Sequence, residues 1–365
     1  MASSREILLA LVRSALWRKP FEVDESMPDW TEILRLAEQQ TVMGLVADSL
    51  RFLPDSMRPS GEMYRKLQMK AVLIAQSHAL LNMKLAQTVR FLESNGLNTV
   101  LFKGQGVALN YPDPITRQCG DIDLYVGEKS FQKALDLLKP GEQMDKYRYI
   151  KHFDYDDGGV HVEIHRIAET LPGWRKNRLF QQWTVRSLEQ SSLRRVEIAG
   201  EMINLPPVNF DALYIMNHIW HHFVLGGIGL RQLCDWTMYL HKFHGDIDKD
   251  LLKADLHRFG LSEAWQILGC IAVEYLGLPP EELPLYTGEY KDKSDMILQI
   301  IWSEGNFGKY SKGATPRPAG YIQGKLHSFR RNSSRYGRLI PISPVYMMKA
   351  WASYTVTGIL NVFNR

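Results

Sequence analysis

The chain has 365 residues, of which 45% are hydrophobic, and its 44 Lys and Arg against 40 Asp and Glu give a formal net charge of +4. This length and apolar content exclude a disordered chain and predict two or three globular domains, while the small charge does not identify nucleic acid as a partner. The three Cys form no CxxC pair, which argues against a disulfide scaffold or a zinc ribbon and favours a cytoplasmic protein.

Residues 1–95 are predicted to form a helical region. The sequence MASSREILLALVRSALWRKPF at the start predicts an amphipathic helix, because its apolar stretch is too short and too charged for a signal peptide. Residues 63–93 carry apolar side chains at spacings of three and four, which predicts one long helix ending at Asn95 and Gly96. No segment has the uncharged apolar run of about 20 residues that a membrane-spanning helix requires.

Residues 96–205 change to a mixed α+β pattern. Short β-rich runs occupy residues 97–104 and 121–126, with a short helix and a Pro-containing loop between them. A helix is predicted at 128–139 and is stopped by Pro140. Two hairpins are predicted, one from strands 148–155 and 160–167 around a DDGG turn, the other from 193–200 and 201–206.

Residues 206–304 are predicted to form a C-terminal helical domain, and residues 305–365 a basic arm with a terminal helix. Four helices are expected in the first of these regions, at 211–223, 230–243, 247–260 and 261–277. No Asp or Glu follows Glu304, and the Gly, Pro, Ser and basic residues of 305–344 predict a long ordered loop or a flexible arm. Aromatic residues between these cations are suited to RNA binding through 305–340, although an arm packed on acidic helices is slightly favoured.

Two aspartates lie one residue apart in the run RQCGDIDLYV. Alternate side chains of a strand share a face, so Asp121, Asp123 and Tyr125 point one way while Ile122 and Leu124 point into the core. Neighbouring carboxylates raise each other's pKa unless a cation lies between them. Because the ligands that the strand 121–126 itself offers are carboxylate oxygens, the pattern predicts a hard ion such as Mg²⁺.

Residues on either side of this strand extend the pattern. Upstream, Lys103, Gly104, Gln105 and Gly106 end a strand and open a helix, where backbone N–H groups can bind phosphate. Lys103 or Arg117 would add positive charge. Downstream, VHVEIH places His161, Glu163 and His165 on one face, so that Glu163 supplies a third carboxylate. A phosphate loop, a DxD pair and a later acid are what metal-assisted nucleotidyl transfer requires.

The order KG, YPDP, R, GDIDLYV and HVEIH resembles the DNA polymerase β-like nucleotidyltransferase superfamily. Within it, the chain is most similar to a large, mostly uncharacterised bacterial family whose members read roughly KG(x)nYPxPxxRxxGDIDLLV. A second likeness is HxxHHF at His218, His221 and His222, followed by GLRQLCDW at 229–236. The resemblance covers about residues 97–240. The chain departs from the superfamily's usual Gly-Ser pair, since Gln105 separates its two glycines, much as in toxin-like members with a KGG loop.

The resemblance implies an α+β fold, with a polymerase β-like core of mixed sheet and helices between helical N- and C-terminal regions. It implies an enzyme that moves an NMP from an NTP to an acceptor, with two Mg²⁺ ions when the NTP is bound and pyrophosphate as the leaving group. The implied metal ligands and catalytic acids are Asp121, Asp123 and Glu163. The implied nucleotide-binding residues are Lys103, Gly104, Gln105, Gly106 and Arg117, and the substrate pocket would include His165, His218, His222, Arg231 and Asp235.

Several alternatives stay open from the sequence. The acceptor is either a small molecule, which is favoured, or a tRNA or protein modified by a toxin-like enzyme, and a nucleotide-binding module without turnover is the third hypothesis. A zinc site built from the histidines is disfavoured because the chain has no HExxH and no paired cysteines. Arg231 and Asp235, four residues apart, are expected to form a pair within one helix or to support the pocket wall.

Overall fold

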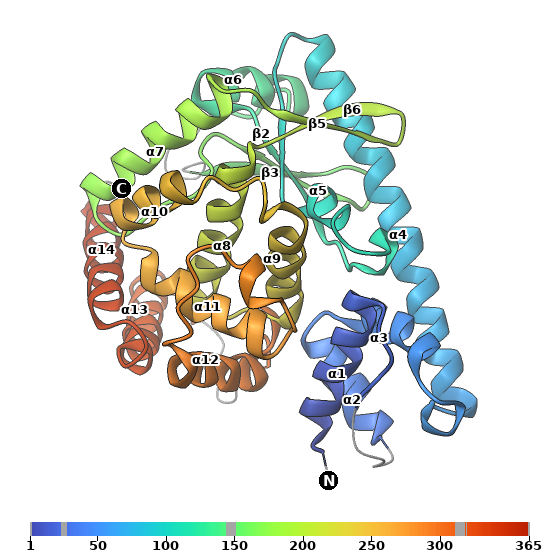
Figure 1. The fold of residues 1–365 in the computed structure, drawn as a ribbon. Coiled ribbons are helices and arrows are strands. Elements are labelled where there is room, and N and C mark those ends of the chain that lie inside the picture. Colours follow the sequence, from blue (N-terminus) through green and yellow to red (C-terminus); the bar gives the residue numbers. More distant parts are fainter. Residues whose placement is uncertain (1, 23–27, 144–150, 311–317, 319, 364–365) are drawn as a thin grey trace.

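The computed structural model describes residues 2–22, 28–143, 151–310, 318 and 320–363. Its N-terminal part is helical, as predicted. The helices are α1 (Ser4–Trp17), α2 (Trp30–Gln39), α3 (Met43–Ser49) and α4 (Gly61–Ser94), with short 3-10 turns at Leu50–Phe52 and Asp55–Met57. The long helix α4 runs along one side of the molecule, with α1 to α3 beside its first half and a sheet beside its second half (Figure 1).

A four-stranded mixed sheet lies at the centre of the α+β part, and this confirms the predicted fold class. The strands β1 (Val100–Phe102), β2 (Asp121–Tyr125), β3 (His152–Asp156) and β4 (His161–His165) are arranged in the order β1-β2-β4-β3. Strands β2 and β4 are parallel, and the other two pairings are antiparallel. The two predicted hairpins are both present, as β3 with β4 and as β5 (Arg194–Ile198) with β6 (Glu201–Leu205); residues 144–150 lie outside the described part.

Both faces of the strand β2 are covered. Ile122 and Leu124 pack in one apolar cluster with α4 and with Phe131 of α6 (Gly127–Leu138). The opposite face carries Asp121, Asp123 and Tyr125 and is covered by the helical half of the chain, so that Asp123 is only 3% exposed. The alternation predicted for this strand is therefore present, but its acidic face lies in the interior of the molecule.

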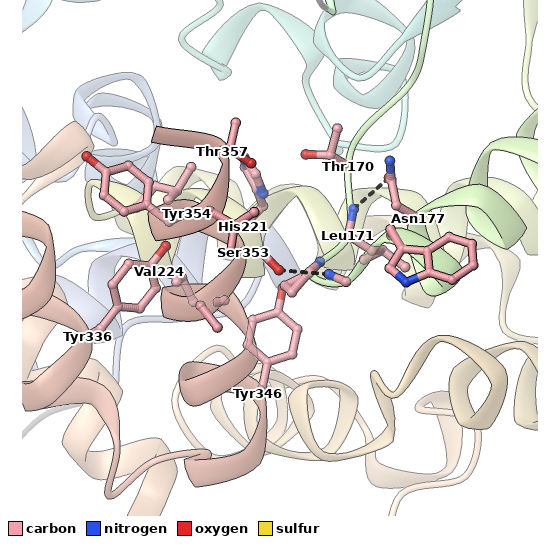
Figure 2. A pocket seen from close by; sticks show the side chains of 17 residues that line it. Thr170, Leu171, Asn177, His221, Val224, Tyr336, Tyr346, Ser353, Tyr354 and Thr357 are labelled. Atoms are coloured by element: carbon pink, nitrogen blue, oxygen red, sulfur yellow. Dashed lines mark hydrogen bonds between the residues drawn. The ribbon is translucent and has the colours of Figure 1, made fainter. Parts of the chain in front are cut away.

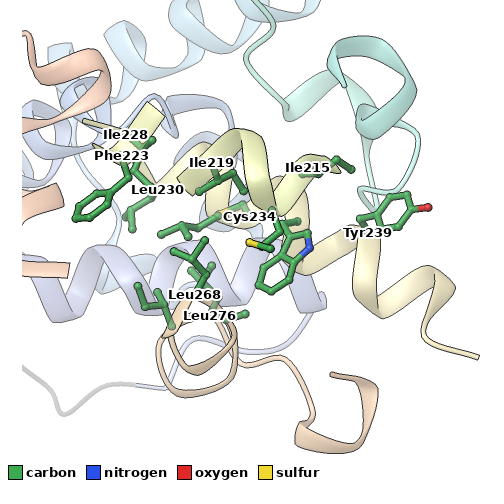
Figure 3. Close-up of a cluster of buried hydrophobic side chains, with 14 of the residues drawn as sticks. Ile215, Ile219, Phe223, Ile228, Leu230, Cys234, Tyr239, Leu268 and Leu276 are labelled. Carbon is green, nitrogen blue, oxygen red and sulfur yellow. The ribbon is translucent and has the colours of Figure 1, made fainter. Parts of the chain in front are cut away.

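The helical half is built around the buried helix α8 (Val208–Leu225). The four helices predicted here are present as α8, α9 (Leu230–Phe243), α10 (Lys249–Phe259) and α11 (Ser262–Glu274); α7 (Trp174–Glu189) and α12 (Lys291–Glu304) complete this half. Figure 3 shows apolar side chains of α8 and α9 meeting those of α11. Because α8 is apolar on nearly all sides, it can be enclosed by other helices. Its few polar side chains are therefore candidates for a functional role.

The prediction of a loop or arm over residues 305–344 is wrong at Tyr321–Leu339, which form helix α13; residues 311–317 and 319 lie outside the described part. The predicted terminal helix is present as α14 (Pro344–Phe363). Gly324 and Gly337 inside α13 hid the helical pattern, but Tyr336 and Leu339 are buried against the core. No helix in the described part of the chain is both long enough and apolar enough to cross a bilayer.

Arg335 explains why this basic segment packs on the core. Its guanidinium is buried, donates from Nη1 to Glu304 at 2.6 Å and from Nε to the carbonyl of Val224 at 2.8 Å, and also contacts the carbonyl of Phe223. The last carbonyls of a helix have no partner within that helix, so Arg335 satisfies two of them at the end of α8. Part of the basic charge after Glu304 therefore stabilises the fold.

We predict that Arg335→Ala lowers the free energy of unfolding by about 3 kcal/mol, because buried Glu304 would keep only the exposed Arg338 as a partner and two carbonyls of α8 would lose their donor. Urea denaturation measures this change. The matched control is Arg331→Ala, which removes an exposed arginine of the same helix and should change stability by less than about 0.5 kcal/mol. Equal losses in the two variants would contradict the assignment of Arg335.

Candidate active site

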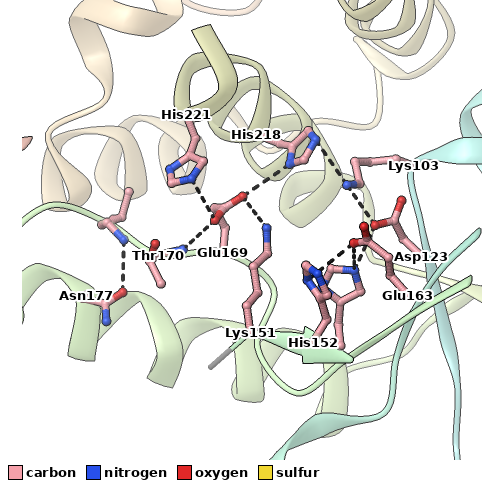
Figure 4. A network of polar contacts seen from close by, with 12 residues as sticks. Lys103, Asp123, Lys151, His152, Glu163, Glu169, Thr170, Asn177, His218 and His221 are labelled. Carbon is pink, nitrogen blue, oxygen red and sulfur yellow. Dashed lines mark hydrogen bonds and ion pairs between the residues drawn. The ribbon is translucent and has the colours of Figure 1, made fainter. Parts of the chain in front are cut away.

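The register of the parallel pair β2 and β4 brings the predicted acids together. Asp123 lies opposite Glu163, and Asp121 lies opposite His161. The Nε2 atom of His165 is 2.9 Å from Asp123 Oδ1 and 3.3 Å from Glu163 Oε2, so two of the carboxylates converge on one imidazole (Figure 4). Asp121, Asp123 and Glu163 therefore lie on one face of two adjacent strands.

The charges of these acids are coupled. The charge of Asp123 and burial raise the pKa of Asp121. Burial acts against ionisation of Asp123, but Lys103 and the hydrogen bond from His165 hold its pKa well below the usual range. Burial likewise opposes ionisation of Glu163, yet the hydrogen bond from His165 lowers its pKa. The site therefore concentrates negative charge that a single lysine does not balance.

Lys103 projects into this negative region from a strained backbone. It precedes α5 (Gly104–Ala108) with φ 48° and ψ −131°, a conformation that a residue with a side chain rarely adopts. Its Nζ lies 3.2 Å from Asp123 Oδ1 and 3.2 Å from Nε2 of His218. Burial lowers the pKa of Lys103, but the surrounding carboxylates more than offset this and raise it, so its side chain is an ammonium ion.

The residues of the loop 103–106 have two different roles: some line the cavity, and others hold the loop in place. Gly104 lines the cavity beside the acids and has φ +42°, which favours glycine. A Cβ on Gly106 would lie 2.7 Å from Leu205 Cδ2, so this glycine allows close packing against β6. The side chain of Gln105 is buried and donates to the carbonyl of His78 and to Asn82 of α4. The side chain of Gln105 thus anchors the loop and does not reach the cavity.

A cavity of about 200 Å³ lies where the loop, the sheet and the helical half meet. It is lined by ten of the residues proposed from the sequence, namely Lys103, Gly104, Arg117, Asp121, Asp123, Glu163, His218, His222, Arg231 and Asp235. His165 is fully buried beneath Asp123 and forms the floor behind the carboxylates. Residues from the strands and from α8 and α9 therefore form one site although they are far apart in sequence.

Arg117 and Asp235 form a buried ion pair. Arg117 donates from Nε and from Nη2 to the two carboxylate oxygens of Asp235, each at 2.7 Å, and Tyr111 donates to the same carboxylate at 2.6 Å. The expected pair of Arg231 with Asp235 is wrong, because Arg231 donates instead to the carbonyl of Gln118 at 2.6 Å. Arg117 is thus already compensated by a carboxylate, whereas Arg231 remains a cation on the cavity wall.

We predict that Asp235→Asn lowers the free energy of unfolding by about 3 kcal/mol, since it leaves the Arg117 charge buried without an anion. Thermal or urea unfolding measures the loss. Asp246→Asn changes an exposed aspartate beyond the same helix and should stay within about 0.5 kcal/mol of the parent chain. A stable Asp235→Asn protein would argue that Arg117 is free to serve a ligand.

A second group of polar residues was missed by the sequence analysis. Glu169 is fully buried, lies 2.9 Å from Lys151 Nζ and 3.3 Å from His218 Nδ1, and is 3.6 Å from His221 (Figure 4). Burial opposes the ionisation of Glu169, but Lys151 and the histidines hold its pKa well below the usual range. Glu169 follows β4 in an irregular segment, where no periodic pattern marks it. It links α8 to the strand that carries the acids.

A larger cavity of about 690 Å³ lies on the other side of this group. Figure 2 shows aromatic rings and hydroxyl groups around it, with His221 at its wall. Its lining includes Thr170, Trp174, Asn177, His221, Tyr336, Tyr346, Ser353, Tyr354 and Thr357. His221 contacts Glu169 at 3.6 Å, and Lys151 and His218 contact the same carboxylate from the smaller cavity. The two cavities are therefore separated by one cluster of charged side chains.

The histidines of α8 give the protein a predicted pH dependence. Burial and the nearby Lys103 lower the pKa of His222 to about 4, and burial also holds the pKa of His218 well below the usual range. A histidine takes up a proton near pH 6.5 when the chain is unfolded, so the unfolded state binds more protons between about pH 6.5 and 4. Stability should therefore fall as the pH falls through this window.

We predict that His222 accounts for about 1 to 3 kcal/mol of this loss, which the variant His222→Asn should not show. Urea denaturation at pH 7.5 and at pH 5 gives the difference for each protein. His257→Asn, which changes an exposed histidine of α10, should keep the pH dependence of the parent chain. If His222→Asn destabilises as steeply on acidification as the parent chain, His222 is not buried in its neutral form.

Three comparisons relate the chain to known proteins. A family model described as "Uncharacterised nucleotidyltransferase" matches residues 26–277, more than half of the chain. No curated protein matches the sequence. A solved structure of an antigenic nucleotidyltransferase-like protein from Paracoccidioides brasiliensis is 14% identical and aligns over 52% of this chain and 91% of that chain, with a TM-score of 0.28. A TM-score this low supports no inference about the present chain.

Proposed function

The chain belongs to this uncharacterised nucleotidyltransferase family, and from that membership we propose that it is a Mg²⁺-dependent enzyme that moves an NMP from an NTP to an acceptor. The observation that carries the proposal is the convergence of Asp121, Asp123 and Glu163 at one cavity, opposite Lys103. A nucleotidyltransferase needs this combination of carboxylates for metal ions and cations for phosphate.

The donor set fits magnesium. Asp121, Asp123 and Glu163 offer hard oxygen ligands, and Lys103 contributes one positive charge against their three negative charges. The raised pKa of Asp121 reflects the repulsion from Asp123 that a divalent cation would remove. Asp121 and Asp123 would hold two ions together with the NTP, and Glu163 would share one of them. When bound, Mg²⁺ would neutralise the triphosphate and the pyrophosphate leaving group.

The remaining residues have distinct tasks in this proposal. Lys103 would exchange its contact with Asp123 for a phosphate oxygen, and Arg231 would neutralise a second phosphate from the opposite wall. Glu163, whose pKa is lowered chiefly by the His165 hydrogen bond against the effect of burial, is ionised and would accept the proton of the acceptor hydroxyl. His165 would keep the carboxylates of Asp123 and Glu163 in place. The backbone at Gly104 would approach the phosphates.

We favour a small molecule as the acceptor. The cavity at the acids, about 200 Å³, is smaller than the roughly 300 to 1,000 Å³ typical of ligand sites, so an NTP would extend beyond it. The neighbouring cavity of about 690 Å³ falls within that range, and its rings and hydroxyl groups suit a cyclic, hydroxyl-bearing compound, whose reacting hydroxyl would have to extend past the Glu169 cluster to reach Glu163. These features support an acceptor that is enclosed by the protein.

Two alternatives have less support. An RNA or protein acceptor, as in a toxin-like enzyme, would bind to the basic segment after Glu304. However, Arg335 and Arg338 of that segment both pair with Glu304. Isotope from labelled NTPs appearing in a small-molecule, RNA or protein fraction would separate these acceptors. A nucleotide-binding module without turnover would bind NTP and release no pyrophosphate with any acceptor.

We predict that Asp121→Asn combined with Asp123→Asn abolishes Mg²⁺-dependent nucleotide binding, because the charge that attracts the cation is removed while the side-chain volumes are kept. Binding of each labelled NTP with and without Mg²⁺ measures the loss, and circular dichroism checks the fold. Glu197→Gln, which changes an exposed acid on β5, is the matched control and should bind like the parent chain. Unchanged nucleotide affinity in the double variant would refute the proposed site.

A further inference from the structure

Two imidazoles lie beside the acids of the candidate active site. His152, Glu163 and His165 present one nitrogen or oxygen atom each, and all three atoms lie within 4.8 Å of one another. Nδ1 of His152 is 3.4 Å from Glu163 Oε2, and Nε2 of His165 is 3.3 Å from the same oxygen. A fourth group, Asp123, has its Oδ1 atom 2.9 Å from His165 Nε2. Four potential ligand groups therefore surround one small volume.

The sheet itself creates this arrangement. His152 of β3 lies directly opposite His165 of β4, and Glu163 lies two residues before His165 on the same face. The two rings have centroids 4.9 Å apart. Side chains held by paired strands have little freedom to move apart, so the cluster is pre-organised. Sequence spacing alone does not reveal it, because its ligands come from three strands, β2, β3 and β4.

His152 has a ring nitrogen that lacks a hydrogen-bond partner among the described residues. Its Nδ1 is buried, and it makes no hydrogen bond among the residues that the structure describes, although Glu163 is close. A buried polar atom without a partner is costly and rare. His152 and Glu163 both line the cavity, whereas His165 lies beneath them, so an ion could reach the group from solvent.

We propose that His152, Glu163 and His165, with Asp123, form a binding site for a borderline transition-metal ion such as Zn²⁺. Imidazole nitrogens are ligands for zinc and related ions, whereas Mg²⁺ prefers oxygen. The inference deepens the proposed function, because Glu163 and Asp123 would serve both sites. The ion would take the place of the proton that His165 Nε2 donates to Asp123 and Glu163, and that proton would pass to solvent. Metal binding by this group does not itself require nucleotidyl transfer.

Co²⁺ is a suitable probe, because its visible absorption reports imidazole coordination. The full chain, stripped of metal with a chelator, is titrated with Co²⁺ and then challenged with Zn²⁺ or Mg²⁺. We expect about one equivalent of Co²⁺ to bind, Zn²⁺ to displace it, and a large excess of Mg²⁺ to leave the spectrum unchanged. Displacement by Mg²⁺ as readily as by Zn²⁺ would overturn the proposal.

Variants identify the ligands. His152→Asn, at a partly exposed position, should weaken Co²⁺ binding at least tenfold and change the absorption band, with thermal unfolding as the check on the fold. His241→Asn removes a histidine that contacts Glu282 at 2.6 Å elsewhere in the chain, and it should bind Co²⁺ like the parent chain. Equal affinities in the parent chain and His152→Asn would overturn the assignment.

Asp121→Asn separates this inference from the proposed function. Asp121 is outside the imidazole group, so this variant should keep the Co²⁺ spectrum and lose Mg²⁺-dependent nucleotide binding. If the Co²⁺ spectrum persists while the parent chain binds no NTP, the metal site stands and the transferase proposal fails. If the parent chain binds NTP with Mg²⁺ but binds no Co²⁺, the imidazole site is refuted and the transferase proposal stands.

Discussion

The parallel pairing of β2 with β4 is the constraint on which the candidate site depends. A shift of one residue in this register would turn every side chain of one strand to the other face. Glu163 would then point away from Asp123 and into the apolar cluster around Phe131. The apolar residues Ile122, Leu124, Val162 and Ile164 fix the register, because they are all buried on the opposite face. The hydrophobic core thus sets the distance between charged groups that the hydrophobic effect would never bring together.

The acids are tolerated in the interior because the α+β part supplies two lysines, and the helical half supplies imidazoles, at the same depth. Lys103, in the loop before α5, contacts Asp123, and His218 of α8 contacts the same ammonium group. A second carboxylate, Glu169, is satisfied by Lys151 and by the histidines of α8. The contacts of Lys103 and Glu169 with the histidines of α8 thus join the strands and α8 in one polar network.

The sequence predicted the strands, the hairpins and most helices, because these follow from local alternation and spacing. Strand periodicity predicted that Asp121 and Asp123 share one face and that Glu163 lies on the polar face of its own strand, and the family resemblance implied that the three acids form one site. Prediction failed where partners are distant. Asp235 pairs with Arg117 rather than with Arg231, because a buried bidentate contact is stronger than a helical neighbour at a spacing of four. Glu169 and the ring of His152 carry no local signal, and α13 was hidden by its glycines and charges. The domain boundaries and the roles of the site residues stay predictions.

The contact of Arg335 with the end of α8 has a consequence for how the chain is assembled. The carbonyls of Phe223 and Val224 that it satisfies lie within one turn of His221 and His222, on the helix that closes the candidate site. Helix α13 thus contacts the helix that lines the candidate site, although no Asp or Glu follows Glu304 in the chain. During synthesis the acidic strands emerge first, and α8 acquires its fixed end only when α13 has been translated.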